Sequence, residues 1–148
     1  MMDSDPKFDP ATELAARRTG MAFQRTRLAQ DRTLMAVIRT SLSLIGFGFT
    51  IYQFFGSLRG QGVITRDAAP QNFGLALVGL GILMLILGIA YHMRFMIGLR
   101  RLRQSMRTDG LIHGETIFPP SLTLITAFLL LAIGVMAIVS MGFNVGPF

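Results

Sequence analysis

Three long apolar segments alternate with polar and basic stretches along the chain. Residues 40–58, 68–93 and 116–148 contain no aspartate, glutamate, lysine or arginine. A helix that crosses the hydrocarbon core of a membrane needs about 20 mostly apolar residues, each adding about 1.5 Å of length. The pattern therefore predicts three membrane-spanning helices, at about Met35–Phe55, Phe73–Tyr91 and Ser121–Met141.

The composition favours a membrane protein over a soluble one. Hydrophobic residues make up 51% of the chain and the mean hydropathy is +0.53, whereas charged residues make up only 15%; soluble domains carry about 25%. The absence of cysteine excludes disulfides, thiolate nucleophiles and cysteine-based metal sites. We expect an all-α, three-span transmembrane protein with a long first helix that extends into the cytoplasm. Residues 1–10 should form a disordered tail and residues 11–148 a three-helix membrane domain.

The segments between the spans differ in their expected structure. Residues Phe95–Met106 are basic and should extend the second span as a helix. The segment Ser57–Asn72 contains glycine and proline and is expected to be irregular. The pair Pro119-Pro120 suits the start of the third helix, because proline is tolerated in a first helical turn.

The basic residues predict the orientation of the chain in the membrane. They concentrate before the first span and between the second and third spans, whereas the segment between the first two spans has only Arg59 and Arg66. Cytoplasmic segments are typically the ones rich in lysine and arginine. We therefore expect a cytoplasmic N-terminus and a periplasmic C-terminus. The residues that set this asymmetry are Lys7, Arg17, Arg18, Arg25, Arg27 and Arg32 on one side, and Arg94, Arg100, Arg101, Arg103 and Arg107 on the other.

The approach to the first span repeats every seven residues. Each repeat holds an Arg-Thr pair, then a methionine or leucine three residues after the arginine, and then an alanine or serine. Seven residues are nearly two helical turns, so each residue type forms a stripe that drifts only about 20° per repeat. The unbroken repeat predicts one continuous helix running from the cytoplasm into the bilayer, with an arginine stripe about 31 Å long. The arginines are Arg18, Arg25, Arg32 and Arg39.

The arginine stripe has two interpretations. The arginines could bind anionic lipid headgroups, each contributing about 1 kcal/mol near the surface. Alternatively, a parallel homo-oligomer would arrange them as stacked positive rings, and rings of positive charge select anions. Arg39 lies at the start of an uncharged stretch, where it could either reach back to the headgroups or face a pore. The sequence leaves both interpretations open.

The segment from Arg25 to Gly48 resembles a known family signature. It reads Arg-Thr-Arg-Leu-Ala-Gln-Asp-Arg-Thr-Leu-Met-Ala-Val-Ile-Arg-Thr, followed by an apolar stretch that ends in Gly-Phe-Gly. This is similar to the signature of the YidH-like bacterial inner-membrane proteins, domain of unknown function 202. The chain departs from that pattern at four positions, namely Gln30 for Asn, Asp31 for Glu, Leu34 for Phe and Val37 for Trp.

This resemblance implies a location in the bacterial inner membrane and a three-span fold. The wider superfamily includes the membrane domain of the vacuolar transporter chaperone, in which basic residues of the first helix line a path for polyphosphate. The resemblance maps Arg25, Arg32 and Arg39 onto those basic positions. It therefore implies phosphate or polyphosphate as a possible ligand of a homo-oligomer.

Small residues in the second and third spans are spaced for helix packing. Membrane helices approach closely where glycine and alanine align on one face, and we expect the second and third spans to meet through such residues. The packing could lie within one molecule or between subunits, and we expect Leu85 and Leu129 to face lipid. The small residues are Gly74, Gly81, Gly88, Ala127 and Gly134.

No residue pattern predicts catalysis, a metal site or a cofactor. His92 and His113 are the only histidines; His92 should end the second span, and neither has a carboxylate at ligand spacing. Asp31 is interpreted as a charge partner beside Arg32. Few aromatic residues accompany the basic segment 94–107, so nucleic acid is not an expected partner. We expect no enzyme, and two functions remain: an anion or polyphosphate conduit, or a scaffold subunit that binds lipid headgroups or a partner protein.

Overall fold

The computed structural model describes residues 10–62, 69–108 and 121–143. Within these residues the chain forms three helices and no strand, which confirms the all-α prediction and the long first helix. Residues 1–9 of the expected disordered tail and the pair Pro119-Pro120 lie outside the described residues, while Pro10 already belongs to the first helix. The helices are α1 (Pro10–Gly60), α2 (Ala69–Thr108) and α3 (Leu122–Phe143).

The first helix runs through its 51 residues without a break, as the seven-residue repeat predicts. Pro10 begins it, because proline costs nothing in a first turn whose N–H groups have no partner within the helix. Gly62 follows its end with a φ of 73°, a backbone conformation that glycine adopts without strain. The irregular segment expected at Ser57–Asn72 is too long at both ends, because α1 continues to Gly60 and α2 begins at Ala69.

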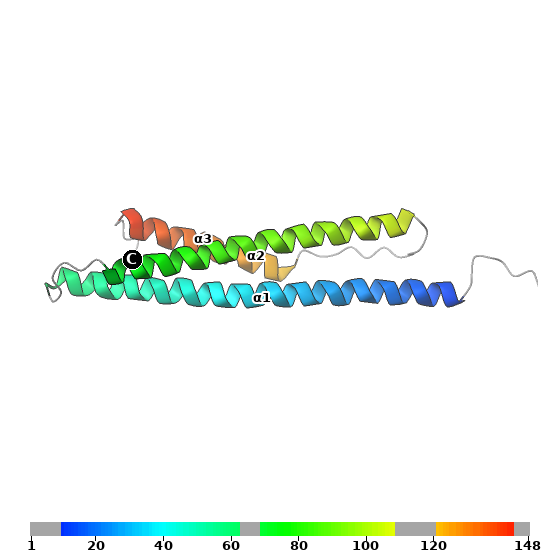
Figure 1. Ribbon diagram of the computed structural model, residues 1–148, viewed down its shortest axis with the longest axis horizontal. Coiled ribbons are helices and arrows are strands. Elements are labelled where there is room, and N and C mark those ends of the chain that lie inside the picture. Colours follow the sequence, from blue (N-terminus) through cyan, green and yellow to red (C-terminus); the bar gives the residue numbers. More distant parts are fainter. Residues whose placement is uncertain (1–9, 63–68, 109–120, 144–148) are drawn as a thin grey trace, which may run out of the picture.

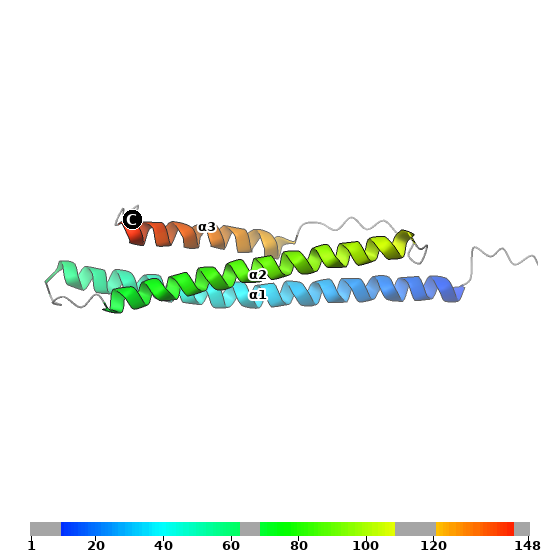
Figure 2. The same cartoon turned by 45° about the horizontal axis from the view of Figure 1, so that its top comes forward.

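The three helices form an elongated up–down–up arrangement (Figures 1 and 2). α1 and α2 lie antiparallel along most of their lengths, and the shorter α3 covers only the half that includes the C-terminal part of α1. At about 1.5 Å per residue, α1 is about 76 Å long, α2 about 60 Å and α3 about 33 Å. The hydrocarbon core of a bilayer is about 30 Å thick, so only α3 fits it closely. All three helices are long and apolar enough to cross a membrane.

The parts of α1 and α2 that extend past α3 form a two-helix projection. We call this projection the arm and define it as residues 10–32 of α1 and 93–108 of α2. The arm includes the basic extension expected at Phe95–Met106, and α2 continues through it to Thr108.

The glycine stripe of α2 packs against α1. A Cβ on Gly74 would lie 2.7 Å from the carbonyl oxygen of Gly48, and a Cβ on Gly88 would lie 2.6 Å from a methyl carbon of Val37. Only glycine allows the two backbones to approach this closely. The glycines of α2 therefore meet the first span, and the expected contact between the second and third spans is made from α3, by Ala127 and by Gly134 against Ile82.

The third helix packs through small and apolar residues on its inner face. Ala127 is fully buried in a cluster with Leu34, Leu85 and Ile89, and Met141 is buried with Ile45 and Val78. The hydroxyl of Tyr52 also donates a hydrogen bond of 2.8 Å to the carbonyl oxygen of Met141. The two clusters tie α3 to both long helices.

The expectation that Leu85 faces lipid is wrong, because its exposed fraction is 0%. Leu85 lies four residues after Gly81, and residues four apart share one face of a helix. It therefore points toward α1, as Gly81 does. Leu129 of α3 is 61% exposed, as expected for a lipid-facing residue.

Candidate functional site

The arginine stripe lies on the side of α1 opposite the molecular core. The buried residues of α1 are Leu34, Ser41, Ile45 and Gly48, and these define its inner side. At about 100° per residue, Arg39 points about 140° away from Leu34. Arg18, Arg25, Arg32 and Arg39 are all exposed.

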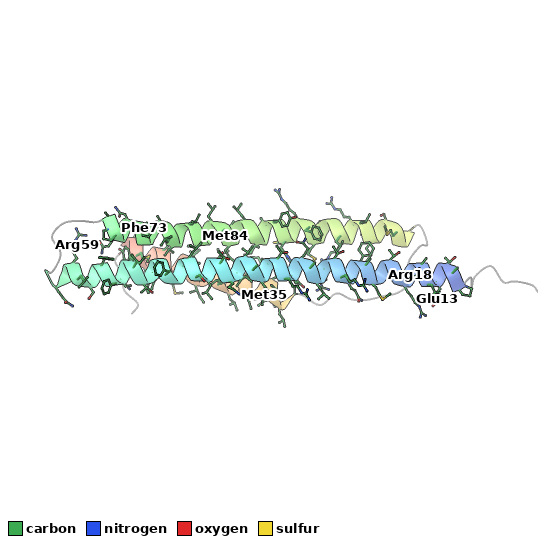
Figure 3. All side chains as sticks on the ribbon, turned by 60° about the horizontal axis from the view of Figure 1, so that its bottom comes forward. Glu13, Arg18, Met35, Arg59, Phe73 and Met84 are labelled. Atoms are coloured by element: carbon green, nitrogen blue, oxygen red, sulfur yellow. The ribbon has the colours of Figure 1, made fainter. Side chains whose placement is uncertain are left out.

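The other residues of the repeat flank the arginines on this side. In each repeat the methionine or leucine and the alanine or serine lie about 50° to either side of the arginine stripe. Met21, Leu28, Met35 and Leu42 are 50–60% exposed, and Figure 3 labels Arg18 and Met35 among the side chains around α1. We call this surface the outer face of α1; it comprises the four arginines, these four large apolar residues, and Ala22, Ala29, Ala36 and Ser43.

The threonines of the Arg-Thr pairs are bonded within α1 itself. Each threonine hydroxyl donates to the backbone carbonyl oxygen four residues earlier, at 3.0–3.1 Å. Such bonds give the hydroxyl hydrogen a partner inside the helix. The donors are Thr19, Thr26, Thr33 and Thr40.

The guanidinium groups of the stripe are available for binding. Among the described residues, none forms a hydrogen bond or an ion pair with the guanidinium of any of the four arginines. Each guanidinium offers five N–H donors in a planar fork that suits carboxylate and phosphate oxygens. Near the N-terminal end of the stripe, Arg18 and Arg25 line a shallow open hollow together with Met21, Ala22 and Thr26. The stripe can therefore bind anions along its length.

The contacts with α3 give the depth of the stripe relative to the apolar part of the molecule. A Cβ on Gly134 would lie 3.2 Å from the side chain of Ile45, so these two residues are level. α1 and α3 run in parallel, which brings Leu122 level with about residue 33 of α1. Arg39 then lies about 9 Å inside the length of α3, while Arg25 lies about 12 Å and Arg18 about 22 Å beyond its start.

These depths bear on the lipid interpretation of the stripe. The interfacial regions on the two sides of a bilayer add about 10–15 Å to its hydrocarbon core, so each is about 5–8 Å thick. If α3 spans the hydrocarbon core, headgroups can reach Arg32, and Arg39 by extension of its side chain. Arg18 and Arg25 lie beyond them. On this placement, the headgroup layer is level with Arg32 and within reach of Arg39, whereas the backbone at Arg25 and Arg18 lies outside that layer.

Sequence reasoning missed a pair of ionisable residues that the fold brings together. His92 is only 3% exposed and lies within α2, immediately before the arm. Its Nε2 atom is 3.6 Å from Oδ1 of Asp31 on α1. The expectation that Asp31 pairs with Arg32 fails, because adjacent residues point about 100° apart and Asp31 faces α2. The sequence spacing could have shown that Asp31 faces the core. It lies seven residues, nearly two helical turns, before the apolar Ile38, so both residues are on the inner side of α1.

The described residues contain no cluster of three or more histidine, aspartate or glutamate side chains that could hold a metal ion. Two polar features of the described residues bear on function, namely the outer face and the Asp31–His92 pair.

Comparison with known proteins gives one match. A family model described as a domain of unknown function (DUF202) matches residues 25–98, half of the chain. The matched segment covers the outer face from Arg25 onward, the glycine stripe of α2 and both members of the Asp31–His92 pair. No curated protein and no solved structure matches the chain.

Proposed function

The chain belongs to the DUF202 family, and from this premise we propose that it is an oligomeric membrane protein whose outer faces together line an anion conduit. The observation that carries the proposal is the exposure of the whole arginine stripe on the side of α1 opposite α2 and α3. In a parallel ring of subunits this side faces the central axis. α2 and α3 then lie outside, with their exposed apolar side chains toward lipid.

The residues beside the arginines support this arrangement. On one flank stand large side chains such as Met35, and on the other stand small ones such as Ala36. In a ring, the large flank of one subunit packs on the small flank of the next, which is the head-to-tail contact that closes a cyclic oligomer. The arginines remain between the two flanks and point at the axis.

The arm supplies a second argument for association. Met21 and Leu28 are 50% and 60% exposed and lie before the start of α3, outside the length expected to be in lipid. Exposed apolar side chains aligned on one face in water indicate a contact surface. A neighbouring α1 covers these residues in the ring.

The chemistry of the rings indicates the ligand. Successive arginine rings lie about 10.5 Å apart along the axis, and rings of arginine select anions. The resemblance of the first-helix motif to the membrane domain of the vacuolar transporter chaperone makes polyphosphate the polyanion to test first. We place the protein in the bacterial inner membrane, with the arm in the cytoplasm, because the arm is rich in arginine.

The test is anion flux into liposomes that contain the purified protein, measured with phosphate and with short polyphosphate. We expect flux above that of empty liposomes, retention of flux in Arg39→Lys and loss in Arg39→Gln, because each substitution acts once per subunit in the same ring. Arg94→Gln is the matched control, since Arg94 is an exposed arginine of α2 that lies outside the outer face.

Two results would contradict the conduit. One is wild-type flux no greater than that of empty liposomes, which would favour the scaffold function, in which the same arginines hold lipid headgroups or a partner protein. The other is flux unchanged by Arg39→Gln, which would remove Arg39 from the path.

A further inference from the structure

Beyond Arg39, the side of α1 that carries the arginines continues as a line of uncharged polar and small residues. At about 100° per residue, each of them points within about 40° of the direction of Arg39, and all are exposed. Large apolar side chains such as Phe47 and Phe54 lie beside this line and are 63% and 58% exposed. We call the line the polar stripe; it comprises Ser43, Gly46, Thr50, Gln53 and Ser57.

The polar stripe crosses the part of the molecule that is expected to lie in the membrane. With Leu122 level with about residue 33 of α1, Ser43 lies about 15 Å and Thr50 about 26 Å inside the length of α3. Gln53 lies near the far end of that length, about 21 Å beyond Arg39. Polar side chains aligned at this depth are typical of a surface that contacts protein or water instead of hydrocarbon.

The hydrogen bonds of the stripe show which groups it offers to a ligand. The hydroxyl of Ser43 donates to the carbonyl oxygen of Arg39 at 3.0 Å, and that of Thr50 donates to the carbonyl oxygen of Gly46 at 2.8 Å. Their hydrogens are therefore used within α1, and only oxygen lone pairs face outward. Within the ranges that the structure describes, the side-chain amide of Gln53 makes no hydrogen bond. It keeps two N–H donors for a ligand.

We propose that the polar stripe continues the conduit across the membrane as a water-filled passage, and that the amides of Gln53 form a second anion-binding ring near its far end. This inference rests on the proposed function, because the polar stripe faces the axis only in a ring that turns Arg39 toward it. Between the two rings the lining offers lone pairs, which accept hydrogen bonds from water and do not bind anions. The anion crosses this stretch in its water shell and meets N–H donors again at Gln53.

The water in the passage can be tested without transport, because the chain has no cysteine. Single cysteines at Ser43 and Thr50 should react with a negatively charged, membrane-impermeant methanethiosulfonate added to proteoliposomes, because a thiol reacts as its thiolate, which water stabilises. Ile133→Cys and Val139→Cys are the matched controls and should not react. Both residues are exposed on α3, and the contact of Gly134 with Ile45 makes them level with about residues 44 and 50 of α1. Mass spectrometry of the intact protein measures the label.

The second ring is tested by the flux of phosphate through variants of Gln53. Gln53→Leu removes the amide from every subunit and should cause loss of flux, whereas Gln53→Asn keeps the N–H donors and should retain it. Flux unchanged in Gln53→Leu would overturn the second ring.

The two measurements separate failure of this inference from failure of the conduit. Wild-type flux in a protein whose cysteines at positions 43 and 50 stay unlabelled, or become labelled no faster than the controls, would keep a conduit and overturn the water-filled passage along α1. Labelled cysteines in a protein without wild-type flux would overturn the conduit, and with it the anion ring at Gln53.

Discussion

Gly81 and Gly79 stand two residues apart on α2 in opposite environments. A Cβ on Gly81 would lie 2.8 Å from the side chain of Ile45 and 3.0 Å from the carbonyl oxygen of Ser41, whereas a Cβ on Gly79 meets nothing within 4 Å. Backbone cannot move aside as the end of a flexible side chain can. The contact at Gly81 is therefore one of the points that set the distance between α1 and α2.

Gly81→Leu should destabilise the protein by about 1–3 kcal/mol, the usual cost of forcing extra atoms into a packed interface. Gly79→Leu is the matched control and should change the stability by less than about 0.5 kcal/mol. Thermal unfolding in detergent, with chemical crosslinking to follow assembly, measures both effects. Equal losses at the two positions would show that the glycine stripe does not determine the packing.

At the level of the elements, the sequence predicts each helix well and their pairing poorly. The seven-residue repeat keeps one register from Arg18 to Ser43, so continuity of α1 could be predicted from local spacing alone. The helix against which each face packs could not be predicted, because a face of small residues suits either neighbouring helix equally. Gly74 and Gly88 meet α1 for this reason, and Asp31 meets His92 only because the antiparallel register of α1 and α2 aligns residues 61 positions apart.

The proposed contact between neighbouring α1 helices can be tested by crosslinking. The double variant Met35→Cys/Ala36→Cys places one thiol on each flank of every α1. In the ring, the thiol at position 35 of one subunit should lie next to the thiol at position 36 of the neighbouring subunit. Mild oxidation in membranes should then give a ladder of disulfide-linked species that ends at one size. Leu83→Cys/Leu87→Cys is the control, because both leucines are exposed on α2 away from the outer face, and it should give no such ladder. A ladder from the control alone would contradict the ring.

At the level of the whole molecule, the two described ends of the chain lie at opposite ends of the rod. α1 begins in the arm, and α3 ends at the far end, beside the C-terminal part of α1 (Figure 2). Three crossings require the chain ends to lie on opposite sides of the membrane. The orientation of the protein across the membrane depends on its positive charge, and the arginines that carry this charge are concentrated in the arm.

Reporter fusions test this topology. A reporter attached before Met1 should be active in the cytoplasm, and one attached after Phe148 should be active in the periplasm, because cytoplasmic segments carry the excess of arginine. Reporters on the same side would exclude three crossings. The inverse result, with Met1 periplasmic, would keep the fold and reverse the proposed orientation.

The central claim is that the outer faces of several α1 helices meet around one axis. The most direct measurement is an experimental structure of the protein in lipid nanodiscs, which gives the number of subunits and the direction of Arg39. We expect a closed ring of parallel subunits, with Arg39 pointing at the shared axis and Met35 of each subunit against Ala36 of the next. A monomer, or an oligomer in which Arg39 points outward to the lipid headgroups, would contradict the account.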